Sequence, residues 1–295
     1  MERYSFSKLK CFGECKYEYL LNYVRCCASC RYYDPKELSC EMDWLTEFDP
    51  EANHFQKTDC EFFEKHVREN NAFAEYGSMV HEILEHYAKG EVGLDELCDL
   101  YEQGFAEQIT CEFPPNKFVV LRDTYYRDGK KFFEGFKGFG NWEVVGVEDE
   151  FTEVIEDEDE DFLLTGFIDL VFRNPNTGGI VVCDHKSKAK FKDKAEAEEY
   201  RKQLYTYALR IYRKFGEFPE TLFFNMFRKQ KKEVFQFDEG QYNEVLEWIK
   251  NTVKEIRSCT EYPHTYNDFK CDNLCNFRST CVHKEQEELM RRCGL

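Results

Sequence analysis

Three charged residues, Asp169, Asp184 and Lys186, interrupt two short apolar segments whose residues alternate as in β-strands. Asp184 and Lys186 stand two positions apart, so their side chains point to the same side of a strand. Asp169 is the one charge in the run 166–172, and a lone buried carboxylate is costly unless it is paired or binds a metal. Two neighbouring acids offer hard oxygen ligands to Mg²⁺ or Mn²⁺, and the lysine can act as an electrostatic clamp.

Two pairs of residues at helical spacing can complete such a site. Gly77 and His81 are four residues apart and therefore share one helix face. The imidazole of His81 would add a nitrogen ligand and favour Mn²⁺ over Mg²⁺. Gln203 and Tyr207 are also four apart, and their polar ends can orient the lysine, a water or a phosphate oxygen.

The elements that must position these residues follow from the hydrophobic periodicity. Helical spacing predicts helices over 5–24, 69–88, 94–109, 116–137, 194–215 and 239–257. Alternation and turn residues predict strands over 142–155, 162–173, 179–188, 220–228 and 232–237. Helices followed by a strand meander, a helix and more strands predict an α/β fold, with a mixed central sheet flanked by helices.

Four motifs in this order carry a resemblance to a known family: GSMVH at 77–81, GFID at 166–169, DHK at 184–186 and QLYTY at 203–207. Together they resemble the RecB-like nucleases of the PD-(D/E)xK superfamily, which include the nuclease domains of RecB and AddB and the CRISPR-associated and phage RecB-like exonucleases. The resemblance covers about residues 5–285 and implies a restriction-endonuclease-like core.

The resemblance also implies roles for individual residues. His81, Asp169 and Asp184 would bind the divalent metal, and Lys186 would serve catalysis together with Gln203 and Tyr207. The first strand of the meander often carries a further acid in this family. Both Glu148 and Glu150 are candidates for it, and the sequence does not choose between them.

The late cysteines follow the spacing Cys271-x3-Cys275-x5-Cys281. In the iron–sulfur members of the resembled family, a fourth cysteine lies about eight residues after a helix-starting serine, as Cys15 does after Ser7. The resemblance therefore implies a 4Fe–4S cluster on these four thiolates, which would clasp the two chain ends together. The family usually has x2 in the late motif, so x3 is a departure. Zinc at the same residues is the main alternative, and Cys11 is a rival to Cys15.

A second cysteine set is Cys27-x2-Cys30-x9-Cys40-x19-Cys60, within a polar segment. Four thiolates with one x2 pair fit a tetrahedral Zn²⁺ site. Cys26 can replace Cys27, and an ordinary loop with reduced thiols is the alternative. We therefore expect a nuclease domain over 1–25 and 67–295 and a zinc-binding insert over 26–66. The remaining cysteines are expected to be small apolar filler: Cys98, Cys111, Cys183, Cys259 and Cys293.

The net charge of −18 has the wrong sign for a protein that coats nucleic acid. DNA binding would depend on local basic stretches, such as the lysines at 186–194 and the basic residues at 228–232. The expected activity is a metal-dependent deoxyribonuclease, an exonuclease acting on single strands or ends. The alternative is a catalytically idle DNA-binding or assembly module of a recombination or CRISPR-adaptation complex.

The sequence also bears on partners and location. It has no GxxxxGK[ST] phosphate loop, so unwinding would need a separate helicase. An integrase is the partner expected for a trimming role in CRISPR adaptation. No apolar run is long enough to span a bilayer and the first residues lack a signal peptide, so a cytoplasmic protein with no membrane partner is expected.

Overall fold

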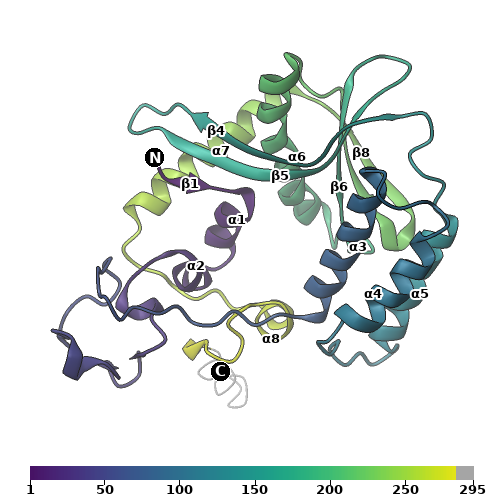
Figure 1. The fold of residues 1–295 in the computed structure, drawn as a ribbon. Coiled ribbons are helices and arrows are strands. Elements are labelled where there is room, and N and C mark those ends of the chain that lie inside the picture. Colours follow the sequence, from purple (N-terminus) through teal and green to yellow (C-terminus); the bar gives the residue numbers. More distant parts are fainter. Residues whose placement is uncertain (284–295) are drawn as a thin grey trace. The chain divides into compact units, whose positions relative to one another are not determined.

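A computed structural model describes residues 1–283 of the chain (Figure 1). The chain divides into two compact units, one of residues 1–6 and 71–250 and the other of residues 7–70 and 251–295. This division groups the segment 26–66 with the N-terminal helices and the C-terminal segment. The boundaries of a nuclease domain and an insert stay a prediction. Cys293 lies outside the described residues.

The first unit contains a six-stranded mixed sheet. Its long strands β4 (Glu143–Ile155) and β5 (Phe162–Arg173) run antiparallel to each other. The other edge of β5 pairs with two strands, β1 (Arg3–Tyr4) at 163–164 and β6 (Ile180–His185) at 170–173. Residues 165–169 of β5 therefore have no ladder partner on that edge among the described strands. The sheet continues with β7 (Thr221–Met226) and β8 (Lys231–Gln236).

Four helices lie against or beside this sheet: α3 (Ala72–Ala88), α4 (Leu97–Gln108), α5 (Leu121–Gly135) and α6 (Lys194–Phe215). Figure 1 shows α3, α4 and α5 packed side by side, and they enclose an aromatic core that includes Tyr76 and Tyr101. The helix α6 is capped at its start by the Asp193 side chain and is followed by Gly216, whose φ of 75° suits glycine. The prediction of an α/β fold with a mixed sheet flanked by helices is confirmed.

Short elements dominate the second unit: α1 (Phe6–Glu14), α2 (Lys16–Tyr23), α8 (Asp268–Asn273), and the two-residue strands β2 (Tyr33–Asp34) and β3 (Ser39–Cys40). The long helix α7 (Glu239–Ser258) leads into it from the sheet unit. The prediction of one helix over 5–24 is wrong. Cys15 has an extended backbone and caps α2, its sulfur accepting the Glu18 N–H, so the helix is interrupted there. No helix in the described part of the chain is long and apolar enough to cross a bilayer.

Candidate active site

The site forms where β6 parts from β5. Their ladder ends at the pair Leu170 and Cys183. Beyond that pair, Oδ2 of Asp169 accepts a hydrogen bond from the backbone N–H of His185 at 2.6 Å. The Asp169 carboxylate thus accepts the N–H that a backbone carbonyl of β5 would accept if the β5–β6 ladder continued. Both sequence-predicted acids are buried there, with Asp169 exposed to 9% and Asp184 to 1%.

Glu148 lies beside Asp169 on the neighbouring strand. The register pairs Val147 with Leu170 and Asp149 with Ile168, which puts Glu148 across from Asp169. Its backbone φ is 44°, a left-handed conformation that residues other than glycine rarely adopt. Such strain is typical of functional sites, where the surrounding structure enforces it. Glu150, the other candidate acid of this strand, is exposed.

His81 reaches the same point from α3. Its Nε2 lies 3.0 Å from the backbone carbonyl oxygen of His185, which can only accept, so Nε2 carries the proton. The unprotonated Nδ1 is then free to serve as a ligand and lies 3.5 Å from Oδ2 of Asp169. Within residues 1–283, His81, Glu148 and Asp169 form the one group whose ligand atoms all lie within 4.8 Å of one another.

The electrostatics of this group favour a cation. Burial, followed by repulsion from Asp184, raises the pKa of Asp169. Burial and the neighbouring Asp169 raise the pKa of Glu148 to about 7. Burial lowers the pKa of His81, which keeps the imidazole neutral and able to bind a metal. Carboxylate oxygens with one imidazole fit Mg²⁺ or Mn²⁺.

Asp184 and Lys186 belong to a closed ring of polar contacts with α6. Nζ of Lys186 lies 2.5 Å from Oδ2 of Asp184 and donates to Oε1 of Gln203 at 2.9 Å. The Gln203 amide donates to the Tyr207 hydroxyl at 2.7 Å, and this hydroxyl donates to Oδ1 of Asp184 at 3.2 Å. The structure thus brings all four predicted residues together. Asp184 faces Lys186 and is not part of the 4.8 Å group.

One residue of the site was missed by sequence reasoning. His185 fixes Asp169 with its backbone N–H and His81 with its backbone carbonyl. The only signal in the sequence is its position between Asp184 and Lys186, on the opposite side of the strand. Because His185 acts through its backbone, any residue type except proline at this position could make these two hydrogen bonds, and the sequence gives no sign of them.

Part of the basic stretch after the DHK motif is paired with acids of α6. Lys188 lies 2.6 Å from Glu196, and Lys202 lies 2.6 Å from Glu199. Arg201 forms an ion pair with Glu198. These pairs reduce the positive field that the lysine spacing alone suggests, although exposed pairs are weak and a polyanion can compete for them.

The late cysteines meet the N-terminal helices within the second unit. Cys15, Cys271, Cys275 and Cys281 line one cavity, whereas Cys11 does not line it. The cavity holds about 20 Å³, room for about one water. Burial, followed by repulsion from Glu18, raises the pKa of Cys275 to about 12. This thiol therefore keeps its proton unless a metal displaces it.

The early cysteines also converge. Cys27, Cys30, Cys40 and Cys60 line a second cavity, of about 370 Å³. Cys26 is fully buried, and its thiol donates to the Ser29 hydroxyl at 3.6 Å instead. A tetrahedral zinc site with Zn–S bonds of about 2.3 Å would hold its sulfurs roughly 3.8 Å apart. Within residues 1–283 no three of these thiols approach to within 4.8 Å of one another, so binding would draw the loops together.

The buried acids, the histidine and the lysine therefore lie together where the two strands part. Residues 53–282 of the chain match the family model described as the PD-(D/E)XK nuclease superfamily. This match covers well over half of the chain, which therefore belongs to the PD-(D/E)XK nuclease superfamily.

Comparison with solved structures finds a likeness to the crystal structure of SSO0001, with 16% sequence identity and a TM-score of 0.34. The likeness covers 74% of this chain and 89% of that chain. A search of curated proteins finds no match.

Proposed function

We propose that this protein is a metal-dependent deoxyribonuclease whose cation is held by His81, Glu148, Asp169 and Asp184. The observation that carries the proposal is the convergence of three ligand atoms within 4.8 Å, beside the Asp184–Lys186 pair. A binding module has no use for buried acids with raised pKa values, because ionising them without a cation destabilises the fold. The nuclease superfamily supports the same conclusion.

The chain's own residues supply orientation and charge. A bound Mg²⁺ or Mn²⁺ would polarise the scissile phosphate and activate water. Lys186 stabilises the negative charge that develops on the phosphate during in-line attack. Gln203 holds the ammonium through Oε1, and Tyr207 holds Gln203 and Asp184 in turn. Gln203 and Tyr207 therefore act as positioning residues.

We further propose an exonuclease that acts on single strands or ends. The support is the depth of the site, since Asp169 is only 9% and Asp184 only 1% exposed. A phosphate can approach such buried ligands more easily on a flexible strand than on a rigid duplex. The net charge of −18 and the ion pairs within the basic stretch also weaken the positive field that would hold duplex DNA.

The test compares end-labelled linear single strands, linear duplexes and circular single strands with Mn²⁺, for the parent and for Asp184→Ala. We expect mononucleotides or short products from linear single strands, little cleavage of circles, and loss of activity in the variant. Cleavage of circles would contradict the exonuclease and retain the nuclease. DNA binding without cleavage in the parent would favour the idle assembly module, and equal cleavage by both proteins would overturn the proposed site.

We also propose that Cys15, Cys271, Cys275 and Cys281 hold a 4Fe–4S cluster. Its support is the single cavity that these four thiols line and the N–H groups that reach their sulfurs, such as Glu18 N–H to Cys15. Hydrogen bonds to the sulfurs are typical of cluster sites. A bound cluster would spread the four thiols, because the present cavity holds about 20 Å³.

Anaerobic purification followed by iron, sulfide and zinc analysis tests the cluster. We expect about four iron and four sulfide per chain, a brown colour, and loss of both in Cys275→Ser. Cys11→Ser is the matched control, because Cys11 does not line the cavity. A colourless protein with one zinc at this site would overturn the cluster and leave the nuclease untouched.

A structural Zn²⁺ on Cys27, Cys30, Cys40 and Cys60 is proposed for the segment 26–66. The support is their shared cavity and the shortage of other stabilisation, since the segment contains only two-residue strands and 3₁₀ turns. Segments of about 40 residues usually need a metal or disulfides to stay folded. We expect Cys40→Ser to lose one zinc per chain and to make this segment sensitive to protease, and Cys26→Ser to keep the zinc.

A further inference from the structure

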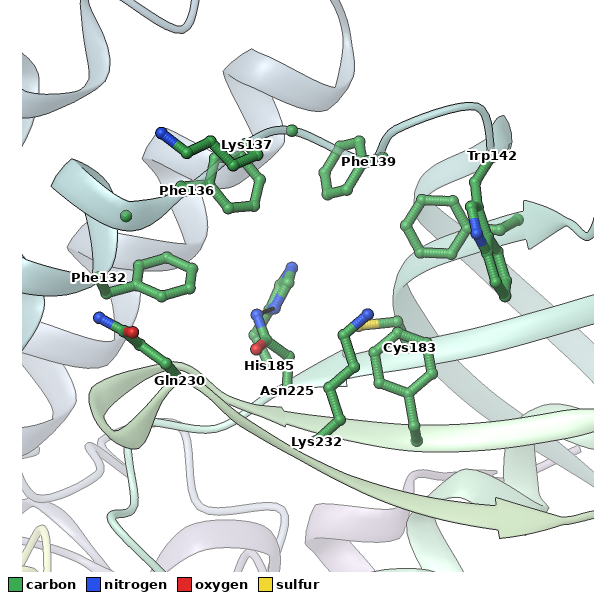
Figure 2. A pocket seen from close by; sticks show the side chains of 14 residues that line it. Phe132, Phe136, Lys137, Phe139, Trp142, Cys183, His185, Asn225, Gln230 and Lys232 are labelled. Atoms are coloured by element: carbon green, nitrogen blue, oxygen red, sulfur yellow. Dashed lines mark hydrogen bonds between the residues drawn. The ribbon is translucent and has the colours of Figure 1, made fainter.

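A cavity of about 300 Å³ opens on the side of β6 opposite to Asp184 and Lys186 (Figure 2). Its walls come from the end of α5, the connection from α5 to β4, and strands β5 to β8. We propose that this cavity holds one unstacked base of the DNA strand whose phosphate lies at the cleavage site. The inference rests on the proposed function and names the part of the substrate that the chain would recognise.

Six of the fourteen residues that line the cavity are Phe or Trp. Phe136 and Phe139 lie 5.6 Å apart, and Phe139 lies 5.1 Å from Phe172. Trp142 packs edge-on against Phe172 at 5.8 Å, at the end of the cavity away from Phe132 (Figure 2). Flat apolar rings of this kind provide stacking surfaces for nucleobases in proteins that bind single strands. Cavities of 300 Å³ and more are also of the size that takes small ligands.

A buried N–H group without an acceptor lies within this apolar wall. The Asn225 amide donates to Nδ1 of His185 at 2.9 Å, so the proton of the neutral imidazole is on Nε2. His185 is 4% exposed, and its Nε2 has no hydrogen-bond partner in the described part of the chain. Figure 2 shows this ring projecting into the space beneath Phe136 and Phe139. An orphaned donor is unfavourable, and the ligand that would satisfy it offers an acceptor.

The cavity and the proposed cleavage site are lined by adjacent residues of β6, His185 and Asp184. Successive side chains of β6 point to opposite sides, so His185 enters the cavity while Asp184 contacts Tyr207 of α6. The rings of His185 and His81 meet edge to face at 5.5 Å. A strand that crosses the end of β6 can therefore place a phosphate near His81 and an adjoining base in the cavity.

One further polar side chain of the lining, Lys232, fits the same ligand. Nζ of Lys232 lies 4.9 Å above the ring of Phe223 and lines the cavity. Lys232 and His185 are both donors, and nucleobases carry carbonyl and ring-nitrogen acceptors on an anionic backbone. A purely apolar ligand would leave the buried Nε2 of His185 unsatisfied, so a base fits better than a hydrocarbon.

An abasic scan tests the pocket with the whole protein. A single abasic residue is moved along a short single-stranded oligonucleotide, and binding is measured by fluorescence anisotropy with Ca²⁺ in place of the catalytic metal. We expect Kd to rise about tenfold at one position next to the cut, as the loss of one stacked base implies, and little elsewhere. A flat scan in a protein that binds and cuts DNA would overturn the pocket and spare the nuclease.

Matched variants then locate the effect. Phe139→Leu removes a wall ring and His185→Leu removes the orphaned donor, and each should reduce the abasic penalty to less than about threefold. Tyr212→Leu removes an exposed ring of α6 outside the cavity and should keep the full penalty. An unchanged penalty in the first two variants would contradict the inference. Absence of both binding and cleavage in the parent would overturn the proposed function and the pocket together.

Discussion

Glu148 stands across the β4–β5 ladder from Asp169, at a position where the backbone of β4 adopts a φ of 44°. A regular strand would continue its ladder through this point. The ladder keeps its register on both sides of this residue but skips the Glu148–Asp169 pair, and the two carboxylates and the His81 imidazole lie within 4.8 Å of one another. A cation bound here would offset the repulsion between the two carboxylates.

Two acids of β4, Glu148 and Glu150, form a natural pair for mutagenesis. Glu148→Gln should weaken binding of Mn²⁺ by about 10–100-fold, the range seen when a group that supports a metal site is lost. Glu150→Gln is the control, because Glu150 is exposed and lies outside the ligand group. Isothermal titration calorimetry measures both affinities. Equal affinities for the two variants would show that Glu148 is not a ligand of the metal.

The role of Lys186 can be distinguished from that of the neighbouring lysines by substitution. Lys186→Met should lower kcat for strand cleavage by about 10²–10³-fold, since it removes a charge aimed at the reacting phosphate. Lys188→Met removes the same charge from a neighbour that pairs with Glu196, and it should change kcat less than about threefold. Single-turnover cleavage at saturating DNA reports the difference. A loss in both variants would indicate general electrostatics instead of a local role.

The raised pKa of Glu148 predicts a pH-dependent stability. The folded protein holds this proton up to about pH 7, whereas the unfolded chain releases it near 4.5. The stabilisation of the folded protein by the Glu148 carboxyl is therefore fully present below pH 4.5 and is lost as the pH rises to about 7. Urea unfolding without added divalent cation should show a smaller loss of stability from pH 5 to pH 8 in Glu148→Gln than in the parent. Parallel pH profiles for the two proteins would contradict the shift.

Two glycines of α5 test the packing that supports the site. A Cβ at Gly129 would overlap the Tyr101 hydroxyl and come within 2.5 Å of the Tyr76 hydroxyl. Gly129→Ala should therefore destabilise the protein by about 1–3 kcal/mol, as overpacking does. A Cβ at Gly135 would meet only Gln230, at 3.6 Å, so Gly135→Ala should stay within about 1 kcal/mol of the parent. Chemical denaturation compares the two, and the reverse order would contradict this packing.

Local patterns predicted most of the secondary structure. The helices α3 to α7 and the strands β4 to β8 fall within or close to the predicted ranges, because each pattern reflects which face of the element is buried. The break at Cys15 was missed, because an apolar stripe continues on both sides of it and only the backbone changes. The strand β1 was missed as well, since two residues carry no periodicity.

The sequence by itself determined the residue types, their order and their spacing, and these were enough to propose a nuclease core around Asp169, Asp184 and Lys186. Only the tertiary structure put Glu148 and not Glu150 beside Asp169, and Cys15 and not Cys11 in the cavity with the late cysteines. It also revealed that the backbone N–H of His185 binds Asp169 while its side chain lines the cavity on the other side of the strand. The reason is physical: periodicity records burial, whereas the convergence of side chains from distant segments depends on where strands part and helices break.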